Sequence, residues 1–177
     1  SNVEGYETLR EEISNRVPHY GNDEACVDAL VDEIGGWVKE EVALYRTWRH
    51  DRFIPSFFCW VMHERLGSVT GATPDGRLCG FPLGDGSGPA QGRERLGPTA
   101  SVLSSTKWEH SPFIGGVAVN MKFSRSLFKA ESIDKMIALI RTFMQRGGFE
   151  MQINVVDTDV LRKAQERVDR LTVRLES

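Results

Sequence analysis

The segment 67–98 constrains the fold more than any other part of the sequence, because its 32 residues include 9 glycines and 4 prolines. Glycine weakens helices and strands, and proline lacks the backbone N–H that both need in their interiors. We therefore expect a long loop, and such a loop in a compact domain is usually either functional or disordered. Arg77, Phe81, Leu83 and Arg93 are spaced through the segment. They favour an ordered loop that is clamped onto a larger body.

Residues 3–66, before this loop, are predicted to be helical. Apolar residues recur at helical spacing, first in a short helix and then in a longer one that Asn22 or Asp23 can cap. The glycine pair at 35–36 interrupts the longer helix and indicates close packing or a kink. A third helix is expected over 55–66, and its aromatic side chains on nearly all sides predict burial on more than one side.

Residues 99–156, after the loop, have the pattern of an α/β fold. Apolar and polar residues alternate over 117–123 and over 149–155, as they do in strands. Because a helix separates the two strands, they are expected to lie parallel in one sheet. Ser132 is expected to cap that helix and Gly147 to end it. The last segment, 157–177, is predicted to form a helix capped by Asp157 or Thr158 and a final strand over 171–175.

Three amides lie on the polar faces of the two predicted strands: Asn120, Gln152 and Asn154. Buried amides require hydrogen-bond partners. These side chains are therefore candidates for lining a polar substrate pocket, or else they satisfy the backbone. Asp75 and Arg77 lie two residues apart in a Thr-Pro-Asp-Gly turn, where we expect them to brace the loop through side-chain hydrogen bonds.

The remaining glycine, histidine and cysteine patterns give little indication of a chemical function. The run GDGSGPAQG lacks the Gly-Lys-Ser/Thr ending of a phosphate-binding loop, and the four histidines show no metal-ligand spacing, so no metal site is expected. Cys26 and Cys59 are expected to be packing residues, whereas Cys79 lies in the loop, where it can be exposed.

Charge and hydropathy exclude two classes of partner. With 22 basic against 25 acidic residues, the net charge of −3 provides no field for nucleic acid or for an anionic membrane surface. No apolar run is long enough to span a membrane. We expect a single domain of a cytoplasmic protein.

Several motifs together extend this interpretation. They are VEGYETLREEI (3–13), PHYGNDEACVDAL (18–30), TGATPDGR (70–77), PLGDGSGPAQG (82–92), GPTASVLSSTK (97–107), GGVAVNMKF (115–123) and QINVVDTDVLRKAQ (152–165). Together and in this order, they resemble the C-terminal part of glycyl radical enzymes, the pyruvate formate-lyase-like family, and most of all its glycerol and diol dehydratase branch.

The resemblance implies a fold and a chemistry. Such enzymes are homo-oligomers built on a ten-stranded α/β barrel, of which this chain would be a partial segment, with helices and a long Gly/Pro-rich loop. A glycyl radical, installed by a radical S-adenosylmethionine activase, takes a hydrogen from a cysteine, and the thiyl radical attacks a small-molecule substrate. In this reading 157–177 is the truncated start of the radical region, since Val173-Arg174-Leu175 match the glycine motif but no glycine follows. The loop 67–98 would then have few contacts with its own chain, because much of the barrel it covers is missing.

Neither radical-bearing residue is therefore expected in these 177 residues. Cys26 mimics the family's thiyl-cysteine pattern, but it occupies a helical position, so no catalytic residue is assigned. No cofactor is expected to bind this chain itself. The favoured interpretation is a fragment of a radical lyase or dehydratase that is inert alone. The alternative is a non-catalytic interaction module: a truncated paralogue or a piece that complements a split enzyme.

Overall fold

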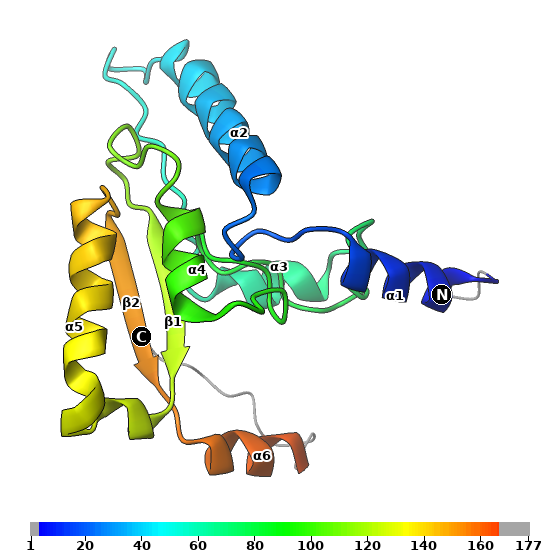
Figure 1. The fold of residues 1–177 in the computed structure, drawn as a ribbon. Helices are drawn as coiled ribbons and strands as arrows, with labels where there is room; N and C mark the ends of the chain where they lie inside the picture. Colours follow the sequence, from blue (N-terminus) through cyan, green and yellow to red (C-terminus); the bar gives the residue numbers. More distant parts are fainter. Residues whose placement is uncertain (1–3, 167–177) are drawn as a thin grey trace.

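The computed structural model describes residues 4–166, and Figure 1 shows helices arranged around a small sheet. The expected strand over 171–175 lies outside the described residues, and the four-part division of the chain remains a prediction. The elements are α1 (Tyr6–Arg16), α2 (Ala25–Ala43), α3 (Met62–Ser68), α4 (Gly97–Ser105), β1 (Ala118–Phe123), the 3₁₀ helix η1 (Arg125–Phe128), α5 (Ala130–Gln145), β2 (Glu150–Val155) and α6 (Thr158–Glu166).

The centre of the fold is a strand–helix–strand unit, as the sequence predicts. β1 and β2 pair in parallel with Asn120 opposite Gln152, and α5 forms the crossover between them. The helix begins earlier than expected: Ser132 already donates its N–H to the Lys129 carbonyl, 2.9 Å away, and lies within the first turn rather than capping it. Gly147 follows the helix with φ +89, consistent with the predicted end.

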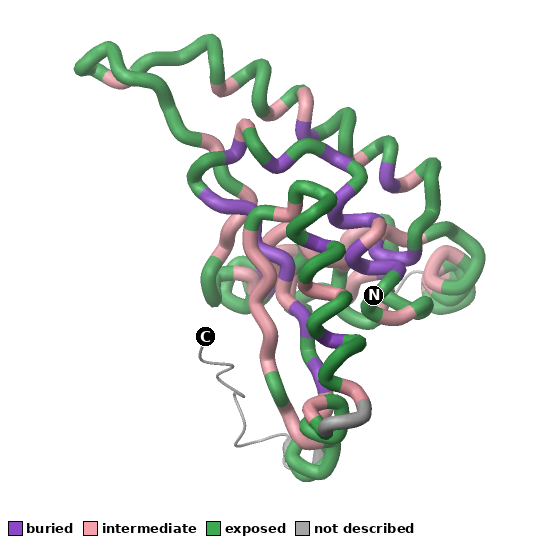
Figure 2. The backbone as a smooth tube through the Cα atoms, turned by 60° about the vertical axis from the view of Figure 1, so that its left-hand side comes forward, coloured by how far each residue is buried: buried purple, intermediate pink, exposed green. Residues whose placement is uncertain are grey.

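One face of this sheet carries the main hydrophobic core. Side chains from alternate positions of β1 pack against α4 and α5, and the partly buried side chains of β2 join them. Buried residues accordingly gather along the middle of the molecule, whereas its outlying segments are mostly exposed (Figure 2). The buried members of this core are Val102, Val119, Met121, Phe123, Met136 and Phe143.

A second core joins α2 to the segment before β1. Trp108, Phe113 and Val117 are buried there, and the Phe57 ring meets the Trp108 ring edge-on with centroids 5.4 Å apart. Gly35 is buried against the same tryptophan: a Cβ at Gly35 would lie 3.5 Å from the Trp108 ring. This is the close packing that the glycine pair predicts.

A neighbouring side of α2 is apolar and exposed. Leu30, Ile34 and Trp37, which follow one another at helical spacing, are 51%, 42% and 57% exposed. The helix therefore has two apolar sides, of which only one is packed within the described chain. Within residues 4–166 no helix is both long and apolar enough to cross a membrane.

The aromatic segment corrects the prediction of a helix over 55–66, because α3 begins only at Met62. Phe57 instead pairs with the start of β1 in parallel: its N–H donates to the Gly116 carbonyl at 2.8 Å, and its carbonyl accepts from the Ala118 N–H at 3.2 Å. Strand-like pairing thus replaces the hydrogen bonds that a helix would supply. Trp60 has φ +53 and is 75% exposed, so the expected burial on several sides is also wrong.

The glycine-rich loop 67–98 pairs with the same edge of β1, further along the strand. Gly86 forms an antiparallel bridge with Val119, and the Ser87 N–H donates to the Ala118 carbonyl at 2.8 Å. A Cβ at Gly86 would collide with that carbonyl oxygen, so glycine is needed for this approach. β1 therefore lies between β2 on one side and Phe57 with the loop on the other.

The loop also contacts the N-terminal segment. The Arg95 guanidinium donates to the Ser14 carbonyl of α1 at 2.6 Å. A Cβ at Gly21 would lie only 2.6 Å from the Pro89 Cβ, which shows how closely the turn after α1 approaches the loop. The expectation that 67–98 has few contacts with its own chain is therefore wrong.

Candidate functional site

The three candidate pocket amides lie on one face of the sheet. In the parallel register Asn120 is opposite Gln152, and Asn154 is opposite Lys122 one step further along the same face. This is the face away from the main core, and the three amides are half-buried. Amide groups both donate and accept hydrogen bonds, so this row can bind hydroxyl or carboxylate groups of a small molecule.

The glycine-rich loop borders this amide row. A Cβ at Gly88 would lie 3.9 Å from the Asn120 backbone, and Ser87 Oγ donates to the Ala118 carbonyl at 2.9 Å. The loop backbone is thereby held beside the part of β1 that carries Asn120. The structure brings together the amides and this part of the loop, although they lie in separate parts of the sequence.

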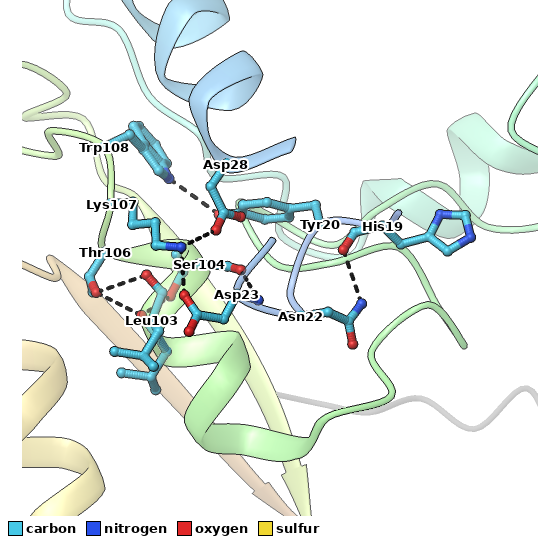
Figure 3. Close-up of polar contacts among 12 residues, drawn as sticks. His19, Tyr20, Asn22, Asp23, Asp28, Leu103, Ser104, Thr106, Lys107 and Trp108 are labelled. Carbon is cyan, nitrogen blue, oxygen red and sulfur yellow. Dashed lines mark hydrogen bonds and ion pairs between the residues drawn. The ribbon is translucent and has the colours of Figure 1, made fainter. Parts of the chain in front are cut away.

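The loop is held in turn by a polar junction between the turn before α2 and the end of α4 (Figure 3). Lys107 Nζ lies 2.5 Å from the Asp23 carboxylate and 2.7 Å from that of Asp28, which is 1% exposed. Hydrogen bonds to Asp23 and then Asp28 raise the pKa of Lys107. The Trp108 indole N–H donates to the Tyr20 hydroxyl at 3.2 Å, and burial raises the pKa of Tyr20 to about 12.

Asn22 connects this junction to the loop with all of its amide atoms. Its Nδ2 donates to the carbonyls of His19 and Arg93 at 3.0 and 2.8 Å, and its Oδ1 accepts from the N–H groups of Arg95 and Leu96 at 2.7 and 3.1 Å. It therefore does not cap α2.

Asp23 does not cap α2 either, because its side chain is paired with Lys107. The residue before α2 is Glu24, whose side chain makes no capping bond. Tertiary hydrogen bonds use the side chains that the sequence offered as caps.

Asp75 and Arg77 lie within the loop and bond to it. The Asp75 carboxylate accepts from Thr73 Oγ1. The Arg77 guanidinium donates to carbonyls of the loop, including those of Phe81 at 2.6 Å and Gly71. These contacts all join residues of the loop, and that they brace it stays a prediction.

Cys26 and Cys59 differ from expectation, whereas Cys79 is exposed, as its place in the loop allows. Cys26, expected to be a packing residue, is exposed in the first turn of α2, and Cys79 is exposed in the loop. Cys59 is half-buried, and its Sγ lies 4.0 Å from His63 Nδ1 and 3.2 Å from Asp85 Oδ1. The four-residue spacing from Cys59 to His63 is a weak indication of this cluster, but the loop that brings Asp85 to it is distant in the sequence.

Comparison with known families agrees with the fold and the motifs. The family model described as "Glycine radical" matches residues 83–175, and the model described as "Pyruvate formate lyase-like" matches residues 1–67. The chain therefore belongs to the glycyl radical enzyme family.

Individual relatives within this family are dehydratases, lyases and decarboxylases. The chain is 34% identical over 167 residues to a trans-4-hydroxy-L-proline dehydratase of Clostridioides difficile, covering 94% of this chain and 21% of the relative. Among solved structures it resembles the glycerol-bound, B12-independent glycerol dehydratase from Clostridium butyricum, with a TM-score of 0.83, 35% identity, and coverage of 92% and 21%. A Roseburia inulinivorans protein studied for 1,2-propanediol dehydration gives a TM-score of 0.85, 35% identity, and coverage of 92% and 20%. The chain thus spans about a fifth of the length of these relatives.

Proposed function

We propose that this chain contributes the amide row and its bordering glycine-rich loop to the ten-stranded α/β barrel of a glycyl radical dehydratase or lyase. The observation that carries the proposal is the row of Asn120, Gln152 and Asn154 on one half-buried sheet face, beside a loop held by the polar junction. Relatives named for dehydration of glycerol, propanediol and hydroxyproline support it, because each of those compounds carries a hydroxyl group.

In this proposal the amides bind and orient the substrate. Gln152 and Asn120 lie side by side and can donate to one hydroxyl oxygen while accepting from a neighbouring hydroxyl. Holding the reacting group in one orientation is itself a large part of catalysis. The radical chemistry comes from a glycine and a cysteine elsewhere in the complete enzyme, after activation by a radical S-adenosylmethionine enzyme, and the enzyme is a homo-oligomeric cytoplasmic protein.

A second candidate is a piece that complements a split enzyme. The exposed apolar side of α2 favours it, because Leu30, Ile34 and Trp37 form a surface suited to burial against another polypeptide. In the first candidate the remaining four-fifths of the enzyme is part of the same polypeptide. In the second it is a separate polypeptide that binds this chain without a covalent bond.

The test uses the chain with activase, S-adenosylmethionine and reductant, alone and together with the remaining barrel segments supplied as a joined or a separate polypeptide. We expect no doublet radical signal in electron paramagnetic resonance from the chain alone, and dehydratase turnover only in the completed protein. In that protein Gln152→Ala should raise KM for a diol by about tenfold, the effect of one to two lost hydrogen bonds. The exposed Gln91→Ala, a matched loss of an amide, should leave KM unchanged.

Unchanged KM in Gln152→Ala, Asn120→Ala and Asn154→Ala alike would contradict the role of the amide row. A radical on the chain alone would contradict the proposal that its chemistry needs residues from elsewhere.

A further inference from the structure

Three side chains of different chemistry converge where the loop meets α3. Cys59 precedes the helix, His63 is in its first turn, and Asp85 comes from the loop. Their ligand atoms lie within 4.8 Å of one another: Cys59 Sγ to Asp85 Oδ1 is 3.2 Å, His63 Nδ1 to Asp85 Oδ1 is 3.6 Å, and Cys59 Sγ to His63 Nδ1 is 4.0 Å. Each of these atoms is one that binds divalent transition metals.

The distances agree with ligation of one small ion. With zinc bonds of about 2.3 Å to sulfur and about 2.0 Å to nitrogen and oxygen, a tetrahedron separates its ligand atoms by about 3.3–3.6 Å. The three observed separations differ from those values by about 0.5 Å or less, which side-chain rotation can supply.

A Cys–His–Asp catalytic relay does not fit the same geometry. In such a relay the imidazole contacts the thiol through one ring nitrogen and the carboxylate through the other. Here both Cys59 Sγ and Asp85 Oδ1 approach the same atom, His63 Nδ1. Three potential ligand atoms that lie within 4.8 Å of one another suit a shared ion better than a relay.

The backbone holds the cluster in place. Gly86 N–H donates to Cys59 Sγ at 3.1 Å, a contact that favours the thiolate once a metal replaces its proton. Gly86 itself is fixed by its bridge to Val119 of β1. Without a metal, burial raises the pKa of the Cys59 thiol, so the free site keeps its proton at neutral pH.

We propose that Cys59, His63 and Asp85 bind one zinc ion. Binding releases the Cys59 thiol proton to solvent and forms the Zn–S bond, so charge and atoms balance. The His63 and Asp85 side chains are 13% and 29% exposed, which leaves the fourth position to a water molecule. The ion joins the loop to α3, independently of the function proposed for the amide row.

The test is a titration of the full metal-free chain with Co²⁺, which reports zinc-type sites spectroscopically. We expect saturation at one equivalent, a thiolate-to-cobalt charge-transfer band in the near ultraviolet, and loss of the band when Zn²⁺ is added. Cys59→Ser should abolish the band, whereas the matched control Cys79→Ser, at an exposed cysteine, should retain it. Asp85→Asn should weaken Co²⁺ binding by at least about tenfold.

Circular dichroism checks that each variant is folded. If Cys59→Ser unfolds, His63→Gln replaces it as the deciding variant, since it keeps the thiol and should still weaken binding by at least about tenfold. The proposal is overturned by absence of the band in the unaltered chain, by a band that survives Cys59→Ser, or by binding that His63→Gln leaves unchanged.

Discussion

His110 illustrates at the scale of one residue how the fold sets a protonation state. The ring is 2% exposed, and the Phe149 N–H donates to its Nδ1 at 3.1 Å. Nε2 lies 2.7 Å from the Ser105 carbonyl, which can only accept, so the proton is on Nε2. Burial lowers the pKa of His110, and the Ser105 contact opposes this shift. The folded chain therefore favours the neutral ring.

This preference predicts a pH dependence of stability. The unfolded histidine takes up a proton near pH 6.5, whereas the folded one resists it, so the unfolded state binds more protons below that pH. The free energy of unfolding should therefore fall between about pH 7 and about pH 5. Urea denaturation at the two values should show a smaller fall in His110→Gln than in the unaltered chain. An exposed-site control, His50→Gln, should keep the full fall; equal falls in all three proteins would argue against this role.

Gly86 and Gly92 allow two effects of an added Cβ to be compared: strain in a left-handed backbone, and collision with the neighbouring strand β1. Gly86 and Gly92 both have left-handed φ, +61 and +74, but only a Cβ at Gly86 would meet the Ala118 carbonyl. Gly92→Ala should lower the free energy of unfolding by about 1–2 kcal/mol, the cost of that conformation for alanine. Gly86→Ala should cost at least about 1 kcal/mol more, because the loop must move away from β1. Thermal denaturation measures both, and equal losses would show that the approach to β1 adds nothing.

At the scale of elements, some of the structure follows from local sequence patterns, and the rest depends on pairing between distant segments. The alternation over 117–123 and 149–155 is a local property, and both strands and their parallel pairing could be predicted from it. Phe57 could not be placed in the same way. Its neighbours have the composition of a buried helix, but its backbone pairs with a strand some 60 residues later. The amide row followed from strand periodicity, whereas the Cys59 cluster depends on the loop path, which no local pattern encodes.

The loop 67–98 depends on the side chain of Asn22, which bonds to it at three points. Asn22→Asp replaces the donor Nδ2 with an acceptor facing two carbonyls, and should lower the free energy of unfolding by about 1–3 kcal/mol. Limited proteolysis should then cut within 67–98 faster than in the unaltered chain. Gln91→Glu is the matched control, since it adds the same charge at an exposed position of the loop. The role of Asn22 is refuted if both variants are cut at the same rate.

At the scale of the whole molecule, much apolar surface remains outside the two cores. In addition to the exposed apolar side of α2, the side chains of Trp48, Trp60 and Val69 are at least 75% exposed. Among the described residues, the two-stranded sheet packs against α4 and α5 on one face only, with the amide row on the other. Association would bury part of this apolar surface, and the associated state therefore has a lower free energy than the single chain.

We expect the chain to self-associate at micromolar concentrations when no other polypeptide covers it. Leu30→Glu combined with Trp37→Glu places two charges on the exposed apolar side of α2, and light scattering should then show a smaller average mass. The matched double variant Leu9→Glu with Val17→Glu alters one residue of α1 and the residue that follows the helix, which are about equally exposed, and should have less effect. A monomer in the unaltered chain would contradict the prediction.

The polar junction also bears on the order in which the chain can fold during synthesis. The bond from Lys107 to Asp28 joins residues 79 positions apart, and the Asn22 contacts span 71 to 74 positions. Asp28 must therefore leave the ribosome and stay hydrated until the segment that carries Lys107 has emerged. At about 5–20 residues per second, that interval lasts about 4–16 seconds. During that time the nascent helices α1 and α2 lack the contacts that this junction supplies.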